Sequence, residues 1–249
     1  MMPHISAHNC RNTWYNTAPG LKVYGSDNPP ACRQRGSHSS VKEFSDCLSL
    51  KSCSERFARS IMINIGYMGI AGSFSDVAAH ELADMMGYKD VRYFPLVCSQ
   101  NILDRLRESE VDYGVLGVEN SSAGPVDEFT QAFDGVSYDV LAEYILPIHH
   151  CLFKLNASAP VEGLTAVATH QQALIQTKDY RAKNFPDLEE IEIDDTALGA
   201  MWLANGHLPE TTAVICSRAA GEMWNLDLIE ENIEDSSTNR TTFWLLKLK

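Results

Sequence analysis

Residues 63–75 of the chain are INIGYMGIAGSFS. Residues 63–68 have the pattern of a strand, the glycines at 69 and 72 mark a turn, and a serine follows the second glycine. After this turn, Ala78, Ala79, Leu82 and Met86 recur at helical spacing within residues 73–86. The stretch therefore predicts a strand, a loop and a helix in succession, which is the building unit of sheets covered by crossover helices.

The same alternation of strand and helix patterns continues to the end of the chain. Two or three crossover units predict a mostly parallel sheet, and the number of segments predicts an α/β fold of two lobes with a cleft between them, the second lobe spanning roughly residues 140–228. The expected strands are 91–94, 113–118, 141–147, 151–155, 165–168, 191–193, 214–216 and 242–248, and the expected helices are 99–108, one starting at 170, 196–205 and 217–224.

Composition excludes several classes of function. The chain has 249 residues, of which 45% are hydrophobic and 21% charged, as in an ordinary soluble globular protein. No apolar stretch approaches the roughly 20 residues that a membrane span needs. The net charge of −13 disfavours broad attraction to nucleic acid or anionic lipid, so a local site must hold any anionic ligand.

The first 60 residues differ from the rest. They carry eight Lys/Arg against four Asp/Glu, whereas residues 61–249 carry 12 against 29, and they lack helical or strand periodicity. We expect residues 1–61 to be a disordered or non-native extension. The alternatives are an organelle-targeting peptide and a translated upstream segment with Met62 as the natural start, and the abrupt boundary favours the second.

Cysteine usage points to a reducing compartment. The seven cysteines are an odd number, no CxxC pair exists and no signal-peptide core precedes them. We expect free thiols, a cytoplasmic protein, and neither a disulfide framework nor a metal site.

Two polar loops follow predicted strands, where ligand sites of α/β sheets lie. In residues 69–75, Ser73 and Ser75 open a helix and could bind an anion there, or could simply cap the helix. In residues 117–124, the consecutive residues Glu119, Asn120 and Ser121 provide a carboxylate, an amide and a hydroxyl. The alternative for this loop is an ordinary turn with a helix cap.

Three further segments contain side chains that could bind a ligand or transfer a proton. Thr169 and His170 lie between a strand and a helix, where His170 could act as a general acid or as a structural hydrogen-bonding group. His149 and His150 face opposite sides of their strand, so at most one of them enters a cleft. In the last strand, alternation places Arg240 and Thr242 on one face and Thr241 and Phe243 on the other.

Taken in order, these segments resemble the prephenate dehydratase family. The family has a Gly-Pro-x-Gly-Thr/Ser-Phe-Ser loop, a Val-Pro-Ile-Glu-Asn-Ser loop, an Ile-x-His-x-Leu strand, and Ser-His-Pro-Gln-Ala-Leu, Thr-Ala-Glu-Ala-Ala and Asn-x-Thr-Arg-Phe segments. The corresponding residues here are 69–75, 116–121, 148–152, 169–174, 196–200 and 239–243. The resemblance covers residues 62–249 and none of 1–61.

The resemblance implies a two-lobed fold like that of type II periplasmic binding proteins, with the active site in the interlobe cleft. It implies conversion of prephenate to phenylpyruvate, carbon dioxide and water in phenylalanine biosynthesis, without metal or organic cofactor. A homodimer is common in the family. We expect the regulatory ACT domain that usually follows the catalytic domain to be missing, because the chain ends after the last catalytic strand.

The resemblance also implies roles for individual residues. Thr241 takes the place of the family's functional threonine, which hydrogen-bonds or protonates the leaving hydroxyl, and Glu119 orients neighbours or passes a proton. The expected donors to the substrate in the cleft are Ser73, Ser75, Asn120, Ser121, Thr169 and His170.

One departure stands out, because the family's arginine after that threonine is Thr242 here. The cation that can fork onto a carboxylate is thereby lost, and Arg240 or Arg218 could replace it. Two other functions stay open: a prephenate decarboxylase that does not aromatise its product, for which Thr241 would be dispensable, and a binding module for small acids without turnover.

Overall fold

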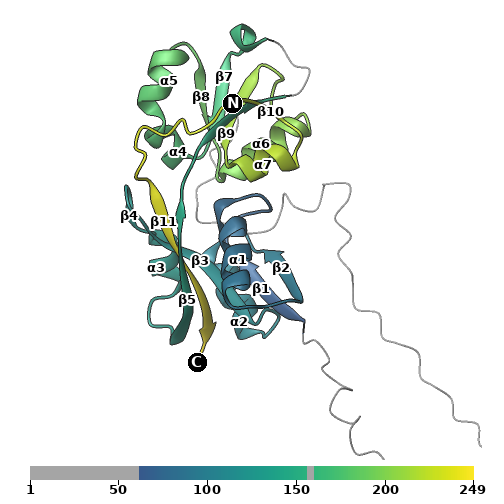
Figure 1. The fold of residues 1–249 in the computed structure, drawn as a ribbon, viewed down its shortest axis with the longest axis vertical. Coiled ribbons are helices and arrows are strands. Elements are labelled where there is room, and N and C mark those ends of the chain that lie inside the picture. The colour runs from purple at the N-terminus through teal and green to yellow at the C-terminus, as the bar shows by residue number, and fades with distance from the viewer. Residues whose placement is uncertain (1–61, 156–159) are drawn as a thin grey trace, which may run out of the picture. The chain divides into compact units, whose positions relative to one another are not determined.

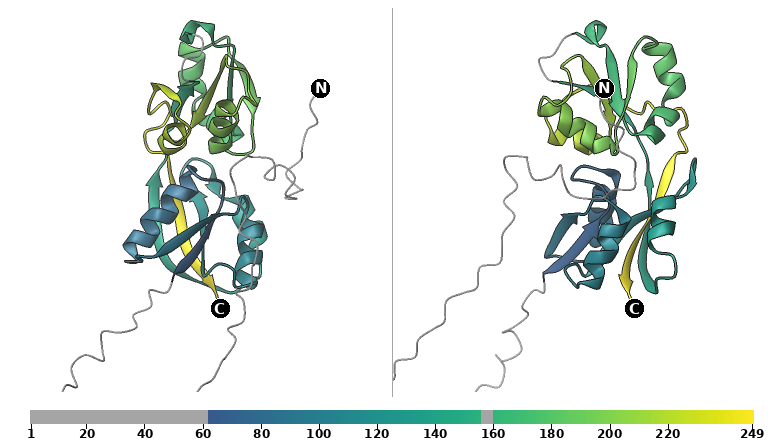
Figure 2. Two further views of the ribbon diagram at one scale, coloured as in Figure 1. Left: turned by 90° about the vertical axis from the view of Figure 1, so that its right-hand side faces the viewer. Right: turned by 180° about the vertical axis from the view of Figure 1, so that it is seen from behind.

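Two mixed β-sheets organise the chain in a computed structural model, which describes residues 62–155 and 160–249 (Figure 1). The expectation for residues 1–61 lies outside the described residues. The first lobe comprises residues 62–147 and 240–249, and the second comprises residues 151–230. Residues 148–150 and 231–239 connect them, so the chain passes between the lobes twice (Figure 2).

The first sheet has the strand order β2-β1-β3-β11-β5, and a short β4 pairs with β3. β1 pairs in parallel with β2 and with β3, whereas β11 is antiparallel to both β3 and β5. The strands are β1 Ile63–Tyr67, β2 Val91–Pro95, β3 Tyr113–Asn120, β4 Gly124–Pro125, β5 Tyr138–Pro147 and β11 Arg240–Leu248.

Helices cover both faces of this sheet. α1 (Phe74–Met85) buries Ala78, Ala79 and Leu82 against one face, together with Phe243 and Leu245 of β11. α2 (Ser99–Arg107) and α3 (Asp127–Ala132) cover the other face, where Leu116 and Leu246 are buried. Successive residues of β11 therefore alternate between the α1 face and the α2/α3 face, as strand geometry requires.

The second sheet has the order β10-β6-β9-β7-β8. β7 is parallel to β8 and β9, and β6 is antiparallel to β9 and β10. Its elements are β6 Cys151–Lys154, the 3-10 turn η2 Val161–Gly163, β7 Ala166–Thr169, α4 Gln171–Gln176, α5 Lys178–Asn184, β8 Glu189–Glu192, α6 Thr196–Ala204, β9 Thr212–Cys216, α7 Arg218–Met223 and β10 Asp227–Glu230.

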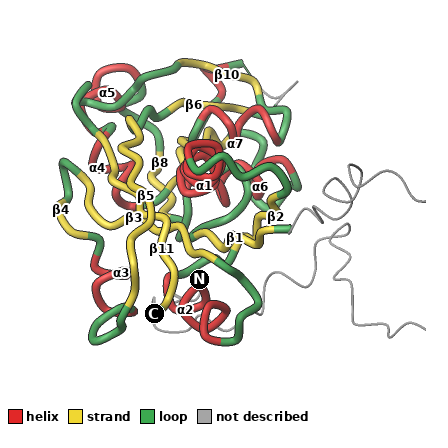
Figure 3. Tube along the Cα trace, turned by 60° about the horizontal axis from the view of Figure 1, so that its bottom comes forward, coloured by secondary structure: helices red, strands yellow, loops and turns green. Residues whose placement is uncertain are grey.

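The two-lobed α/β class predicted from the sequence is confirmed, with helices and strands alternating along the trace (Figure 3). Both sheets are mixed rather than mostly parallel, because the connections between the lobes bring in antiparallel strands. β5 belongs to the first sheet, so the boundary expected near residue 140 moves beyond Pro147. The short elements α3, α5, β4 and β10 were not predicted, since each is too short to show a periodic pattern.

Among the described helices, none is long and apolar enough to cross a membrane. The described cysteines, Cys98, Cys151 and Cys216, are buried, and the other four lie outside the described residues.

Candidate active site

A β-bulge in β3 brings Asn120 and Thr241 to the same face of the first sheet. Asn120 pairs with Thr241, and Glu119 pairs with Thr242, but the next residue of β11 then pairs with Gly117. One residue of β3, Val118, is therefore extra, and it lies among the buried side chains on the α2/α3 face. If the register of Gly117 with Phe243 continued without the bulge, Glu119 would pair with Thr241, and the side chain of Asn120 would point to the opposite face.

The amide of Asn120 has one possible orientation. Its Oδ1 accepts hydrogen bonds from the backbone N–H groups of Ser122 and Ala123, at 2.9 and 3.0 Å. Because backbone N–H groups can only donate, this atom must be the oxygen. Asn120 Nδ2 therefore donates on its other side, to Thr241 Oγ1 at 2.9 Å.

This bond determines what the Thr241 hydroxyl can do. Thr241 Oγ1 accepts from Asn120, and Thr241 donates to no other group in the described part of the chain. A hydroxyl carries one hydrogen and two lone pairs, so its hydrogen is left to donate to a ligand. Asn120 thus prepares Thr241 as a hydrogen-bond donor.

The hydrogen bonds continue from Asn120 into the second lobe. Asn120 Nδ2 also lies 3.1 Å from Asn239 Oδ1, and Asn239 Nδ2 donates to Gln176 Oε1 at 2.9 Å. His150 Nε2 lies 2.9 Å from the same Gln176 oxygen. Sequence reasoning missed Gln176, because an amide at the end of a short helix carries no distinctive pattern, and it included Asn239 in the last family motif without giving it a role.

Glu119 lies apart from this chain of hydrogen bonds. It is exposed, and the register places it beside Thr242, on the face of β11 opposite Thr241. In the resembling family this position of β11 holds arginine, so an arginine there would face Glu119 directly. The structure therefore shows that the departure at Thr242 removes a cation from the neighbourhood of Glu119.

The two candidate replacement cations differ in their surroundings. Arg218 forms ion pairs with Glu222 at 2.7 Å and Glu231 at 2.5 Å, which neutralise it. Arg240 is exposed and, within residues 62–155 and 160–249, forms no ion pair. Its backbone N–H donates to Ser121 Oγ at 3.0 Å, and Ser121 in turn donates to the carbonyl of Thr238, so Ser121 joins β3 to the connection before β11.

The loop of residues 69–72 contacts the second lobe. Gly69 and Gly72 have φ of +86° and +84°, a region that favours glycine. A Cβ on Gly72 would lie 2.9 Å from Ala220 Cα, and the Gly72 carbonyl accepts from Ser217 Oγ at 2.5 Å. The positive φ accounts for glycine at both positions, and at Gly72 the close approach of the Ala220 backbone adds to it.

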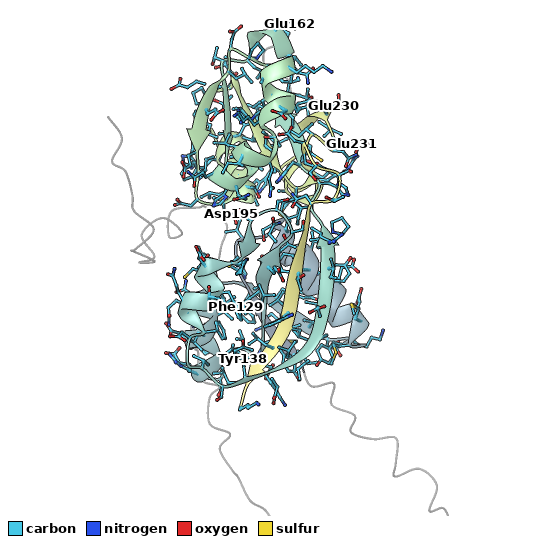
Figure 4. The ribbon with its side chains drawn as sticks, turned by 90° about the vertical axis from the view of Figure 1, so that its left-hand side faces the viewer. Phe129, Tyr138, Glu162, Asp195, Glu230 and Glu231 are labelled. Atoms are coloured by element: carbon cyan, nitrogen blue, oxygen red, sulfur yellow. The ribbon has the colours of Figure 1, made fainter. Side chains whose placement is uncertain are left out.

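Ser73 and Ser75 are both buried at this loop. Ser73 caps α1 by accepting from the N–H of Asp76 at 3.2 Å, which is the structural alternative that the sequence left open. Asp195 lies nearby, where the lobes meet (Figure 4), and its Oδ2 would be 2.9 Å from a Cβ on Gly69. Burial raises the pKa of Asp195, and hydrogen bonds from the N–H groups of residues 197 and 198 oppose that rise.

Thr169 and His170 end β7 and begin α4. Thr169 is fully buried and donates its hydroxyl to the carbonyl of Ile215 at 2.6 Å, so it holds β7 to β9 and has no hydrogen left for a ligand. His170 Nδ1 accepts from the N–H of Gln172 at 3.1 Å, which leaves Nε2 as the ring nitrogen that can face a ligand. Its position at the carboxyl end of β7 matches the expectation.

The adjacent histidines lie in the connection between β5 and β6 rather than in a strand, and they face different surroundings. His149 is exposed and its Nδ1 lies 2.7 Å from Glu234 Oε1, whereas His150 is buried. Among the described residues, no group of three or more His, Cys, Asp or Glu side chains could hold a metal ion. An open pocket of about 210 Å³ adjoins the chain of hydrogen bonds, and Gln176, Asn239, Ser122 and Gln172 contribute to its wall.

Comparisons with known proteins show which family this sequence resembles. The sequence model for prephenate dehydratase matches residues 65–249. The prephenate dehydratase of Lactococcus lactis subsp. cremoris is 29% identical over 185 residues, which are 74% of this chain and 63% of that protein. The chloroplastic arogenate dehydratase/prephenate dehydratase 6 of Arabidopsis thaliana is 28% identical over 246 residues, 98% of this chain and 56% of that protein.

The fold agrees as well. The crystal structure of prephenate dehydratase from Arthrobacter aurescens in complex with L-Phe superposes with a TM-score of 0.67 at 24% identity, covering 75% of this chain and 61% of that one. The chain thus spans less than two thirds of the length of each of these relatives. Since the family's sequence model extends over both lobes and over the strands that carry Asn120 and Thr241, the chain belongs to the prephenate dehydratase family.

Proposed function

We propose that this protein converts prephenate to phenylpyruvate, carbon dioxide and water, a step of phenylalanine biosynthesis. In this reaction the bond between the ring and its carboxylate breaks and releases carbon dioxide. The electron pair of that bond completes the aromatic ring and expels the ring hydroxyl, which gains a proton and leaves as water. The protein must therefore hold two carboxylates and assist a departing hydroxyl.

The observation that carries the proposal is the hydroxyl of Thr241, whose hydrogen is free to donate because Asn120 supplies the bond that its oxygen accepts. A threonine hydroxyl is a weak acid, so we assign it as a donor to the departing hydroxyl within a relay rather than as the sole source of the proton. Asn120 orients it, Asn239 of the connection before β11 contacts Asn120, and Gln176 of the second lobe supports Asn239.

Other residues fit the substrate's negative charge. His170 Nε2 can donate to a carboxylate, because its Nδ1 is already occupied by the N–H of Gln172. We assign Arg240 as a further candidate for carboxylate binding, since it has no acidic partner among residues 62–155 and 160–249. We assign Glu119, Ser73, Ser75 and Ser121 to positioning the loops that border the site.

The substrate has two related candidates. One relative is named for both arogenate and prephenate, which differ in bearing an amino or a keto group on the side chain. The hydroxyl and the ring carboxylate are common to both compounds, so Thr241 would act identically on each. We propose prephenate as the substrate and test arogenate beside it.

The test is to mix the purified protein with prephenate at neutral pH and identify the product by NMR. A sample without enzyme is required because prephenate decays spontaneously in acid. Phenylpyruvate formed faster than in this sample supports the proposal. A decarboxylated but non-aromatic product identifies a prephenate decarboxylase instead, a function that the loss of the arginine at Thr242 favours.

A binding module is the remaining outcome. Unchanged prephenate, combined with a calorimetric binding signal, would contradict the enzymatic proposal and indicate binding without turnover. We further propose that the protein is cytoplasmic, which the free thiols of Cys151 and Cys216 support, and that it forms a homodimer. Light scattering of the purified chain measures its oligomeric state directly.

A further inference from the structure

We infer that His150 is a positioning residue, which donates from Nε2 to Gln176 Oε1 and thereby holds the chain of hydrogen bonds that ends at Thr241. The inference deepens the proposed function and rests on it. It concerns a side chain that the reaction itself does not need, because His150 is buried two hydrogen-bonded amides away from Asn120.

The orientation of Asn120 determines which group donates and which accepts in every hydrogen bond from Asn120 to His150. The backbone N–H groups of residues 122 and 123 orient Asn120, so Asn120 Nδ2 must donate to Asn239 Oδ1. Asn239 must then present Nδ2 to Gln176, and Gln176 must present Oε1. His150 faces that oxygen, so its Nε2 carries a hydrogen and donates.

The surroundings of His150 hold its ring in place. Its backbone N–H donates to Glu234 Oε2 at 2.9 Å, and its carbonyl accepts from the N–H of Ile233 at 3.0 Å. The ring of Phe74, from the first lobe, meets the imidazole edge to face at a centroid distance of 5.8 Å. The ring is thus fixed from both lobes, with Nε2 directed at Gln176.

The other ring nitrogen supports the same tautomer. His150 Nδ1 is buried and has no hydrogen-bond partner within residues 62–155 and 160–249. Burial lowers the pKa of His150, and although Gln176 and Glu234 oppose this effect, the neutral ring is favoured. A neutral ring with its hydrogen on Nε2 leaves only an acceptor unsatisfied at Nδ1, whereas the other tautomer would lose the bond to Gln176 as well.

Removing His150 would release the amide of Gln176. Gln176 Nε2 is also buried and has no partner in the described part of the chain, so only Oε1 anchors this side chain. With one of its two donors gone, the amide can turn over and present Nε2 to Asn239 Nδ2, where two donors oppose each other. Asn239 would then turn or withdraw, and Asn120 would lose support.

A double-mutant cycle tests this coupling. We expect His150→Leu to lower kcat for prephenate by about fivefold, within a range of roughly 2- to 12-fold, as for one neutral hydrogen bond, while KM changes less than about twofold. Gln176→Leu should lower kcat at least as far. Because His150 acts through Gln176, adding His150→Leu to Gln176→Leu should cost less than a further twofold. A full loss on that background would overturn the inference.

Two variants separate positioning from damage to the fold. His150→Gln keeps a donor near the position of Nε2 and should recover at least half of the loss on a logarithmic scale. His149→Leu alters the exposed neighbour, whose ring bonds only to Glu234 among the described residues, and should leave kcat unchanged. If His150→Gln is as slow as His150→Leu, or His149→Leu as slow as either, the inference fails.

The tautomer provides a test independent of turnover. Nitrogen-15 NMR of the full chain, with the signal assigned by its loss in His150→Gln, should show a protonated Nε2 and a bare Nδ1 near pH 7. A hydrogen on Nδ1 would overturn the inference even in an active enzyme. If the protein does not act on prephenate while the expected tautomer is found, the proposed function fails and the bond from His150 to Gln176 stands.

Discussion

At the scale of single residues, the site depends on side chains that have only one way to hydrogen-bond. Two backbone N–H groups orient Asn120, and this orientation passes to Thr241 on one side and toward His150 on the other. Of the three amides in this network, Asn239 is buried, whereas Asn120 and Gln176 are partly exposed, so their orientation depends on their protein partners rather than on burial alone.

The hydroxyl of Thr241 is the first residue to test. We expect Thr241→Val to lower kcat for prephenate by about 10²- to 10⁴-fold, the usual contribution of a positioned proton donor. Thr241→Ser keeps the hydroxyl and should remain within about tenfold of the wild type. Steady-state kinetics with product identification measures both, and circular dichroism checks the fold. Undiminished decarboxylation by Thr241→Val would assign the protein to the non-aromatising decarboxylases.

His150 should also make stability depend on pH. Burial and the neighbouring His149 lower its pKa from the ordinary 6.5, while Gln176 and Glu234 raise it by a smaller amount. The unfolded chain therefore takes up a proton here at higher pH than the folded chain. The contribution of His150 to the unfolding free energy is complete above about pH 6.5 and is lost as the pH falls toward the folded-state pKa.

Urea denaturation at pH 8 and pH 5 measures this effect. The difference in unfolding free energy between the two pH values should be smaller in His150→Gln than in the wild type, because glutamine does not titrate. His149→Gln serves as the control, since it removes the neighbouring imidazole, whose side chain is about half exposed and lies 2.7 Å from Glu234 Oε1, and leaves His150 in place. An unchanged pH dependence in His150→Gln would show that His150 titrates normally.

At the scale of elements, the bulge of β3 decides which side chains share a face. It places Asn120 beside Thr241 and leaves Glu119 beside Thr242 on the other face. Threonine in place of arginine at position 242 therefore changes a cross-strand side-chain pair between β11 and β3, the pair with Glu119. This placement explains how β11 keeps Thr241 in position although the residue after it differs from the family pattern.

Restoring the arginine tests this account. We expect Thr242→Arg to raise the unfolding free energy by about 0.2–1 kcal/mol through a cross-strand ion pair with Glu119. The gain should disappear when Glu119→Gln is combined with it, because the new cation then lacks its partner. Chemical denaturation of the single and double variants measures the pair, and an equal gain in both would mean that the arginine acts elsewhere. A rise in turnover of Thr242→Arg would further show that the departure is a handicap.

At the scale of the whole molecule, two connections and one close contact join the lobes. The contact is that of the loop 69–72 with the start of α7, where Ser217 both donates to the Gly72 carbonyl and accepts from the N–H of Ala220 at 3.0 Å. The same hydroxyl thus caps a helix of one lobe and binds the backbone of the other. The series of hydrogen bonds from Thr241 to His150 links the lobes in a similar way.

Comparing two helix caps isolates the bond between the lobes. Ser73→Ala and Ser217→Ala each remove a cap, which costs about 1 kcal/mol of stability. Only Ser217→Ala also breaks a bond to the other lobe, so its loss should be greater by about 0.5–1.5 kcal/mol. Denaturation measures the totals, and hydrogen exchange should become faster in residues 69–72 for Ser217→Ala. Equal losses would mean that this bond contributes nothing to stability.

The sequence by itself determined the α/β class, most helices and strands, and the loops where the candidate residues lie. Hydrophobic periodicity and turn glycines are local signals, so Ser73, Asn120, His170 and Thr241 could be placed at the ends of their elements from nearby residues alone. The same local signals left open whether Ser73 bound a ligand or capped its helix.

Only the tertiary structure decided which of these residues meet. The bulge at Val118 follows from pairing β3 with a strand more than a hundred residues away, and it alone brings Asn120 to the face of Thr241. Gln176, Asn239 and His150 come from three separate segments and join through hydrogen bonds that no spacing in the sequence reveals. Strand register and amide orientation depend on partners distant in sequence, because each is set by whichever donors and acceptors the fold brings within about 3 Å.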